Sequence, residues 1–412
     1  MQLYNGLPII TNKIPLEEQK GIPHHLLGEI PLSSIPWHVA EFKQRATTLI
    51  DEIRGRGKLP ILVGGTHYYV DSILFNDAIL DHVQDTESQE FPILDEPTDV
   101  LLAELRKVDP EMAERWHPND RRKIRRSLEI YLQTGKPASS HYEEQELQRS
   151  KPAEDPASPS QPWENLLFWV FTQREALCER LDKRIDGMLQ NGLLDEVREL
   201  AEHKQRMTAG GVDVDLTKGI WQAIGYKQLV PHVLSPPKDS QAREASEKAA
   251  LDDMKTATRR YANYQNRWIR LKQLPRLQRC GETAINSLYV LDSTDVKLYN
   301  KRVIEPATSI VGQFLAGTPL PSAKDLSEVA RDVLLKVGEP VVKETAKQRT
   351  CDLCKTVLVT EEAWERHIKS SGHRKQLKKS KRLALVPVES ANDSVQQSDS
   401  AEVDIGDLFG QP

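Results

Sequence analysis

The sequence ILVGGTHYYVDSIL, residues 61–74, decides the fold that we expect. Its first three residues are apolar and predict a short buried strand, and Gly64 and Gly65 then permit a tight turn and a close backbone approach. Thr66 is a favourable N-cap for a helix over the following residues. This arrangement brings backbone N–H groups to the carboxyl edge of a parallel sheet, where a phosphate binds well. An ordinary strand–turn–helix without a ligand is the alternative interpretation.

Length and composition limit the kind of protein. The 412 residues suffice for two or three domains, and 38% apolar with 28% charged residues allow a buried core with polar extensions. Four cysteines are too few for a disulfide scaffold, and two of them have the spacing of metal ligands, so we expect a reducing compartment. No apolar run reaches the ~18 residues that a membrane helix needs.

Apolar spacing predicts the elements around residues 61–74. Residues 36–55 have the pattern of an amphipathic helix, and the alternation of helix and strand favours a parallel α/β sheet. The continuous apolar run Leu166–Phe171 predicts a fully buried strand, followed by a helix from about Glu175 to Glu202. We also expect a folded segment over 1–30, helices over 98–116 and 121–134, turn-rich segments over 75–97 and 148–162, and a helix with a linker over 306–348.

Two helices carry cations in places that need an explanation. Asn119 or Asp120 can cap the helix over 121–134, whose first turns hold five cations, Arg121, Arg122, Lys123, Arg125 and Arg126. The helix dipole disfavours cations there, so a partner anion is one interpretation and a solvated basic face is the other. On the helix over 175–202, Arg180 and Arg184 share one face. The alternative for these two arginines is an ion pair with Asp182 or Asp186.

A second basic region spans residues 254–279. It holds eight Lys or Arg residues and no acid, with Tyr261, Tyr264 and Trp268 among them. Helical spacing places Arg260, Tyr264, Arg267 and Leu271 along one face. A basic helix with exposed aromatic rings is typical of proteins that contact phosphates and stack on unpaired bases. In the alternative interpretation the aromatic rings are buried and the arginines are only solvated.

The C-terminal region carries the most specific spacing in the chain. Cys351 and Cys354 are followed after twelve residues by His367 and after five more by His373, the pattern of a two-Cys two-His zinc finger. Leu358 and Trp364 would form its small core, and zinc would supply much of its folding free energy. Eight Lys or Arg and no acid lie from Arg366 to Arg382, and an acidic, Ser-rich tail that we expect to be disordered follows.

Several segments together resemble the tRNA dimethylallyltransferases, or tRNA isopentenyltransferases, and most closely their fungal and animal branch. The resemblance covers about residues 1–305 and the finger. The segments that carry it are Met1–Tyr4, Ile9–Lys13, Gly21–Leu27, Leu62–Tyr69, His117–Asp120, Arg126–Tyr131, Thr134–Lys136, Arg180–Arg184, Gly192–Val197 and Trp221–Lys227.

The resemblance implies transfer of a dimethylallyl group from dimethylallyl diphosphate to the exocyclic amine of the adenosine 3′-adjacent to the tRNA anticodon. It implies Arg184, with Arg180 beside it, at the leaving diphosphate, and Gly64, Gly65 and Thr66 along the channel of the prenyl donor. It implies magnesium with the diphosphate and structural zinc on the finger. The residues implied at the tRNA are Met1, Gln2, Arg122, Lys123, Ile124, Arg125, Arg126, Tyr226, Lys227, Arg260, Tyr264 and Arg267.

The resemblance also implies an α/β fold with a parallel sheet like that of P-loop NTPases. The domains expected are a catalytic core over 1–80 and 163–305, a helical insertion over 81–162, a linker over 306–348, the finger over 349–382 and the disordered tail over 383–412. We expect a monomer that binds the tRNA anticodon stem-loop and no membrane. Its expected compartment is the cytoplasm, with the mitochondrion and the nucleus as further candidates.

The sequence departs from the family in two places. Relatives have a first strand, a phosphate loop and a general-base Asp before the Met-Gln pair matched by Met1-Gln2, and no G-x-x-x-x-G-K-[ST] occurs here. We expect an in-frame upstream extension of roughly 30–60 residues that carries them. Ala262–Gln265 also lacks the Lys-Arg that relatives commonly carry before the Gln. The alternatives are a catalytically inactive zinc-finger tRNA-binding protein and an adenylate isopentenyltransferase.

Overall fold

The computed structural model describes residues 1–75, 91–150, 163–335 and 346–384. The chain divides into two units, Met1–Gln89 with Ser140–Val342 and Glu90–Ser139 with Lys343–Pro412. The expected turn-rich segment over 148–162 is wrong for residues 148–150, which are the end of helix α6, Ala138–Ser150. Its remainder, residues 151–162, and nearly all of the expected acidic tail lie outside the described residues. None of the helices in the described part of the chain is long and apolar enough to cross a membrane.

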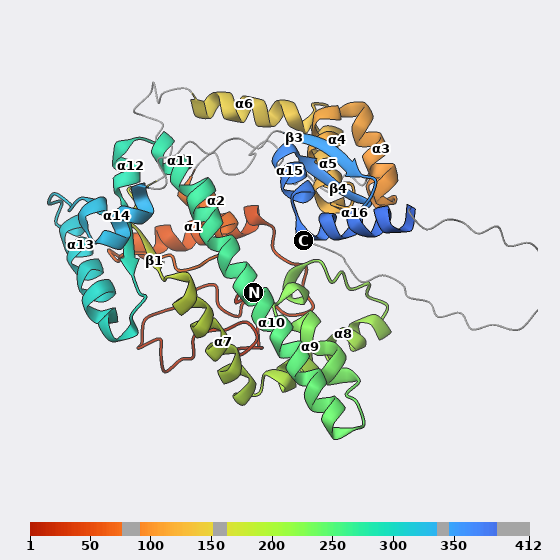
Figure 1. Ribbon diagram of the computed structural model, residues 1–412. Helices are drawn as coiled ribbons and strands as arrows, with labels where there is room; N and C mark the ends of the chain where they lie inside the picture. Colours follow the sequence, from red (N-terminus) through yellow and green to blue (C-terminus); the bar gives the residue numbers. More distant parts are fainter. Residues whose placement is uncertain (76–90, 151–162, 336–345, 385–412) are drawn as a thin grey trace, which may run out of the picture. The chain divides into compact units, whose positions relative to one another are not determined.

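A parallel pair of strands lies in the first unit (Figure 1). Strand β1, Leu167–Phe171, pairs with β2, Leu288–Asp292, so that Phe171 lies opposite Asp292. All five residues of β2 are buried, whereas in β1 only Trp169 is buried and Val170 is 50% exposed. The strand predicted over Leu166–Phe171 is confirmed, but the prediction that it is fully buried is wrong. Strand β2 was not predicted.

The apolar residues 61–63 do not form the expected buried strand. Ile61 is 77% exposed and Val63 is 87% exposed, and no strand pairs with them in the described residues. A strand needs a hydrogen-bonded neighbour to satisfy its backbone groups, so an apolar run alone does not make one. The helix that follows does begin as expected, because α2 spans His67–Leu74.

Helices supply most of the first unit. The helix expected over 36–55 is confirmed as α1, Val39–Gly55. The helix expected from Glu175 to Glu202 is in fact two, α7 over Arg174–Gln190 and α8 over Leu193–Ala209, because Gly192 takes φ +100° and turns the chain between them. The remaining helices to the end of β2 are α6 (Ala138–Ser150), α9 (Tyr226–Leu234), α10 (Ser240–Trp268), α11 (Leu274–Arg279) and α12 (Glu282–Asn286), with a π-helix over Ile269–Gln273 between α10 and α11.

The N-terminal residues are folded, as expected. Tyr4 and Ile10 are buried in a core with residues of α7, α8 and α9, and Tyr4 forms a parallel bridge with Ile30. The carboxylate of Glu196 accepts hydrogen bonds from the backbone N–H groups of Ile9 at 2.8 Å and Ile10 at 2.7 Å. These charge-assisted bonds fix the segment on α8.

Residues after β2 are part of the core rather than a linker. Helices α13, Glu305–Leu315, and α14, Glu328–Leu335, bury Ile310 and Ala330 in the cluster that contains β2. The prediction of one helix and a linker over 306–348 is therefore wrong for residues 306–335, which include two helices packed on the core. Residues 336–345 lie outside the described residues. Local apolar spacing does not reveal which surface a short helix covers.

The second unit contains three helices of the insertion and the finger. The helix expected over 98–116 is split into α3, Thr98–Val108, and α4, Pro110–Arg115, because the buried Asp109 caps α4 through the N–H of Met112 at 3.2 Å. Helix α5 spans Arg121–Thr134, as expected. The finger consists of β3 (Ala346–Cys351), antiparallel β4 (Thr356–Thr360), α15 (Glu361–Ile368) and α16 (Ser371–Ala384), and its hairpin contacts α4.

Candidate functional site

Helix α7 carries the predicted arginines away from the carboxyl end of β1. The guanidinium of Arg180 donates hydrogen bonds to the carbonyl oxygens of Ser293 at 2.7 Å and Thr294 at 2.6 Å, immediately after β2. Arg180 thus fastens α7 to the carboxyl edge of the parallel pair. This is the edge at which ligands bind in open α/β sheets.

The carboxylates closest in sequence to Arg184 are already paired with other cations. Asp182 accepts two hydrogen bonds from Arg259 of α10, and Asp186 lies 2.6 Å from the Lys255 ammonium. These two pairs hold α7 beside α10 (Figure 1). The alternative interpretation, in which Arg180 or Arg184 pairs with Asp182 or Asp186, is therefore wrong.

Arg184 itself has no carboxylate partner within the described parts of the chain. Solvent reaches its side chain, yet the surrounding protein removes enough water to lower the pKa of the guanidinium. An arginine stays protonated in proteins, so this partly desolvated cation would be stabilised by an incoming anion. A phosphate or diphosphate group is an anion of this kind.

The glycine turn contacts α10. The carbonyl oxygen of Gly65 accepts a hydrogen bond from the Gln265 amide at 2.9 Å, and a Cβ atom on Gly65 would lie 2.0 Å from that nitrogen. The predicted close approach is confirmed at Gly65, whereas nothing lies within 4 Å of a Cβ at Gly64. The carbonyl of Thr66 accepts the first backbone bonds of α2, but its side chain makes no capping bond, contrary to our expectation.

The Trp268 side chain joins two helices and is not an exposed ring. Its indole donates a hydrogen bond to the buried carboxylate of Asp71 at 2.8 Å, and the Gln273 amide donates to the same carboxylate at 3.1 Å. Burial raises the pKa of Asp71, against the opposing effect of the bond from Trp268. This contact joins α2 to the end of α10 and was not predicted, because nearly two hundred residues separate its partners.

The two tyrosines of α10 are exposed as predicted. Tyr264 is 55% and Tyr261 is 39% exposed, and their rings lie 6.4 Å apart in a stacked orientation. Arg260 and Arg267 are exposed on the same helix. The alternative of buried aromatic rings is therefore wrong for the tyrosines. Their contact with RNA stays a prediction.

The cations of α5 are mostly paired. Asp120 caps the helix through the N–H of Lys123 and also pairs with the Lys123 ammonium at 2.9 Å. Arg125 and Arg126 share Glu129, at 3.6 and 2.8 Å. Solvated ion pairs thus account for part of this basic face. Ile124 is completely buried, so its predicted contact with RNA is wrong for the side chain.

The remaining predicted RNA contacts are spread over the first unit. Met1 is 42% exposed, and the Gln2 amide donates to the Asn12 carbonyl at 2.5 Å. Lys227 is exposed, but Tyr226 is 3% exposed and packs against Trp221. The ring of Tyr226 is therefore part of the core and cannot stack on a base.

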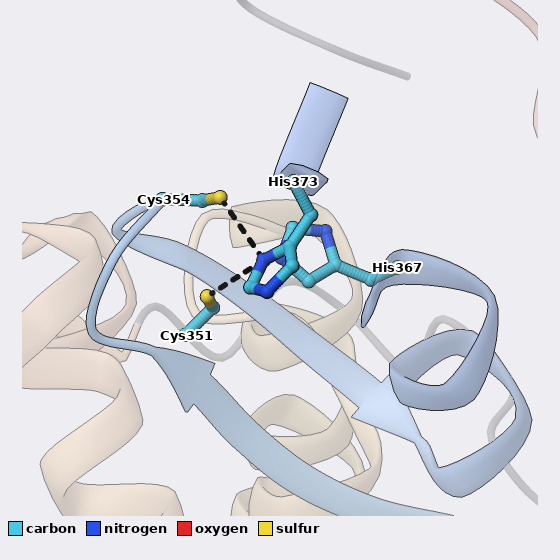
Figure 2. A group of neighbouring side chains, drawn as sticks. All are labelled: Cys351, Cys354, His367 and His373. Carbon is cyan, nitrogen blue, oxygen red and sulfur yellow. Dashed lines mark hydrogen bonds between the residues drawn. The ribbon is translucent and has the colours of Figure 1, made fainter. Parts of the chain in front are cut away.

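The four predicted zinc ligands come together in the second unit, and Figure 2 shows their side chains directed toward one another. One potential ligand atom from each lies within 4.8 Å of all the others. The Nδ1 atom of His373 lies 3.6 Å from the Cys351 sulfur and 3.5 Å from the Cys354 sulfur. Zinc bonds of about 2.3 Å to sulfur and 2.0 Å to nitrogen give a tetrahedral edge of about 3.5 Å. The buried Nε2 of His367 has no hydrogen-bond partner, which also fits a metal ligand.

Comparison with known proteins agrees with this geometry. Residues 2–272 match the family described as IPP transferase. The chain is 35% identical to the tRNA dimethylallyltransferase of Schizosaccharomyces pombe, over 93% of this chain and 89% of that protein. It is 33% identical to the Homo sapiens tRNA dimethylallyltransferase, over 93% of this chain and 80% of that protein. A crystal structure of a eukaryotic dimethylallyltransferase acting on tRNA matches with a TM-score of 0.73 and 30% identity. The match covers 93% of this chain and 90% of that chain.

The fold and the site indicate the class of protein. A mixed α/β protein in which an arginine is bound at the carboxyl end of the parallel strands is suited to a phosphorylated substrate, and the relatives are transferases. The chain belongs to the IPP transferase family.

Proposed function

We propose that this protein transfers a dimethylallyl group from dimethylallyl diphosphate to the exocyclic amine of the adenosine 3′-adjacent to a tRNA anticodon. Family membership over most of the chain supports the reaction. Within the structure, the observation that supports this function is that the charge of Arg184 is not neutralised by the carboxylates beside it. Its neighbouring carboxylates are bound by Lys255 and Arg259, which leaves its charge for a substrate.

Arg184 would neutralise the diphosphate as the bond between carbon and oxygen breaks. Negative charge grows on the leaving oxygen in that step, and a guanidinium positioned beforehand stabilises it most. Arg180 is fixed to the carbonyls of Ser293 and Thr294, so its role is to position α7 as well as to add positive charge. Gly64, Gly65 and Thr66 would line the donor channel, with Gly65 held on Gln265.

Recognition of tRNA requires the target base to leave the anticodon-loop stack. The exposed Tyr261 and Tyr264 offer stacking surfaces for unpaired bases, and Arg260 and Arg267 offer charge to the backbone beside them. The α5 cations and the finger would contact phosphates, which positions the RNA without reading its sequence. These assignments rest on exposure and charge.

Two metals fit this function in different ways. Zinc on Cys351, Cys354, His367 and His373 would hold the finger folded and take no part in the transfer. Within the described residues no second cluster of acidic or His and Cys side chains is suited to a metal. Magnesium would therefore be held mainly by the diphosphate and water, as this ion commonly is in phosphate sites.

Prenyl transfer to an anticodon stem-loop, with AMP as the competing acceptor, tests the function. We expect transfer to the RNA and none to AMP, since the exposed tyrosines and the finger suit a polymer. Transfer to AMP alone would identify an adenylate isopentenyltransferase. Binding of tRNA without transfer to either acceptor would indicate a catalytically inactive RNA-binding protein.

A further inference from the structure

A cavity of about 460 Å³ lies between the start of α7 and the second half of α10, beside the carboxyl end of β1. Its volume is within the range of small-molecule sites. Neither Arg184 nor the glycine turn lines it. Its charged lining is entirely basic and consists of Arg174, Arg259, Arg267 and Arg270.

Most of this positive charge is not balanced by carboxylates. Arg259 is paired with Asp182, and Arg270 lies over the uncharged rings of Trp169 and Phe171 at 5.7 and 6.0 Å. Within the described residues, neither Arg174 nor Arg267 has a carboxylate within salt-bridge distance. Like charges around one cavity repel each other, so an anion inside it would lower the energy of the folded protein.

The position of Arg174 adds to this imbalance. It is the first residue of α7, where the helix dipole disfavours a cation. The N-cap residue, Gln173, makes no side-chain cap, so it leaves the first N–H groups of the helix available beside the arginine. Both features favour a bound phosphate at the same end of the cavity.

The rest of the cavity wall has a different chemistry. Asn263 and Asn266 contribute amides, and Phe171, Leu177 and Leu181 contribute apolar surface. Amides form paired hydrogen bonds with base edges, and apolar surface accommodates the face of a base. Arginines, amides and apolar groups around one cavity are together complementary to a phosphate joined to a base.

From this arrangement we infer that the cavity is a second nucleotide site. It takes one phosphate-bearing nucleotide, free or within an RNA loop, in addition to the adenosine that is modified. The inference extends the proposed function, but its test measures binding and does not depend on prenyl transfer. Arg174 and Asn263 suit the test because both are exposed and neither has another assigned role.

The test is calorimetric titration of the full chain with AMP, with inorganic phosphate and with an anticodon stem-loop RNA. Arg174→Gln removes one cation and should weaken nucleotide binding about tenfold, the effect of losing one charge-assisted bond. Asn263→Asp adds a negative charge on the opposite helix and should weaken binding at least as much. Arg198→Gln, on the exposed surface of α8, is the matched control and should bind normally.

Each outcome decides the inference. Weaker binding of both AMP and RNA by the two variants assigns a site that is open to free nucleotides. Weaker binding of RNA alone assigns a nucleotide of the loop. Equal affinities of wild type and both variants overturn the inference. An equal loss of nucleotide affinity in the control Arg198→Gln also overturns it. So does a wild-type chain that binds inorganic phosphate as tightly as AMP and the RNA. Prenyl transfer measured on the same preparations shows separately whether the proposed function holds.

Discussion

Arg259 of α10 donates hydrogen bonds of 3.0 and 2.7 Å to the two carboxylate oxygens of Asp182 on α7. The pair joins two helices that are distant in sequence and fixes how α7 presents its other side chains. Because Asp182 is bound in this way, it does not neutralise the arginines that flank it on α7. The charge available at the carboxyl edge of the sheet therefore depends on a contact made elsewhere.

The Asp182–Arg259 pair should contribute modestly to stability. Both side chains are about one-third exposed, at 31% and 34%, so solvent screens their attraction. A double-mutant cycle with Asp182→Asn and Arg259→Gln, followed by urea unfolding, should give a coupling free energy of about 0.5–1 kcal/mol. A coupling energy near zero would mean that packing alone holds α7 against α10.

Removal of the Arg184 charge should impair chemistry more than RNA binding. Arg184→Ala should lower turnover on the order of a hundredfold, because one stabilising donor to the leaving group is lost. Affinity for inorganic diphosphate should also fall, while affinity for tRNA should change little. Lys183→Ala is the control, since Lys183 is exposed and paired with Glu179 at 2.7 Å. Wild-type turnover in Arg184→Ala would remove Arg184 from the site.

The finger should bind one zinc ion per chain. Elemental analysis of the purified protein should show this stoichiometry, and Cys351→Ser should abolish it, because three ligands bind structural zinc much more weakly than four. Cys280→Ser is the matched control, since Cys280 lies outside the cluster. Loss of zinc in the control, or its retention in Cys351→Ser, would contradict the assigned ligands.

The exposed lysines of α16 should contribute salt-dependent affinity. Replacing Lys375, Lys378 and Lys379 with Gln removes three cations without touching a zinc ligand or the contact of the finger hairpin with α4. Binding of tRNA should weaken, and the slope of log affinity against log salt should fall by about three. Turnover at saturating tRNA should persist.

The control replaces the exposed Lys238, Lys248 and Lys324, which changes the net charge equally. Unchanged slopes in the α16 variant, or equal changes in both variants, would indicate that the finger contacts another partner.

His67 should make stability depend on pH. Burial lowers the pKa of His67 in the folded state, and its Nδ1 atom is buried without a hydrogen-bond partner. Below about pH 6.5 the unfolded chain then binds more protons than the folded chain, so the free energy of unfolding should fall as pH decreases toward the lowered pKa. Chemical unfolding at pH 7.5 and 5.5 should show a smaller decrease for His67→Gln than for wild type, with His25→Gln as the control. An equal decrease in all three proteins would mean that other groups cause it.

Local sequence determined the features whose parts lie close along the chain. The helix Val39–Gly55, the Asp120 cap and the spacing of the zinc ligands follow from neighbouring residues, because helix periodicity, caps and a short metal-binding hairpin are short-range effects. Tertiary structure alone decided that residues 61–63 form no strand, that Asp182 pairs with Arg259, and that the Gly65 carbonyl accepts a hydrogen bond from Gln265. Each of these depends on a partner that the fold brings from far away in sequence, and a strand or an ion pair exists only when that partner is present.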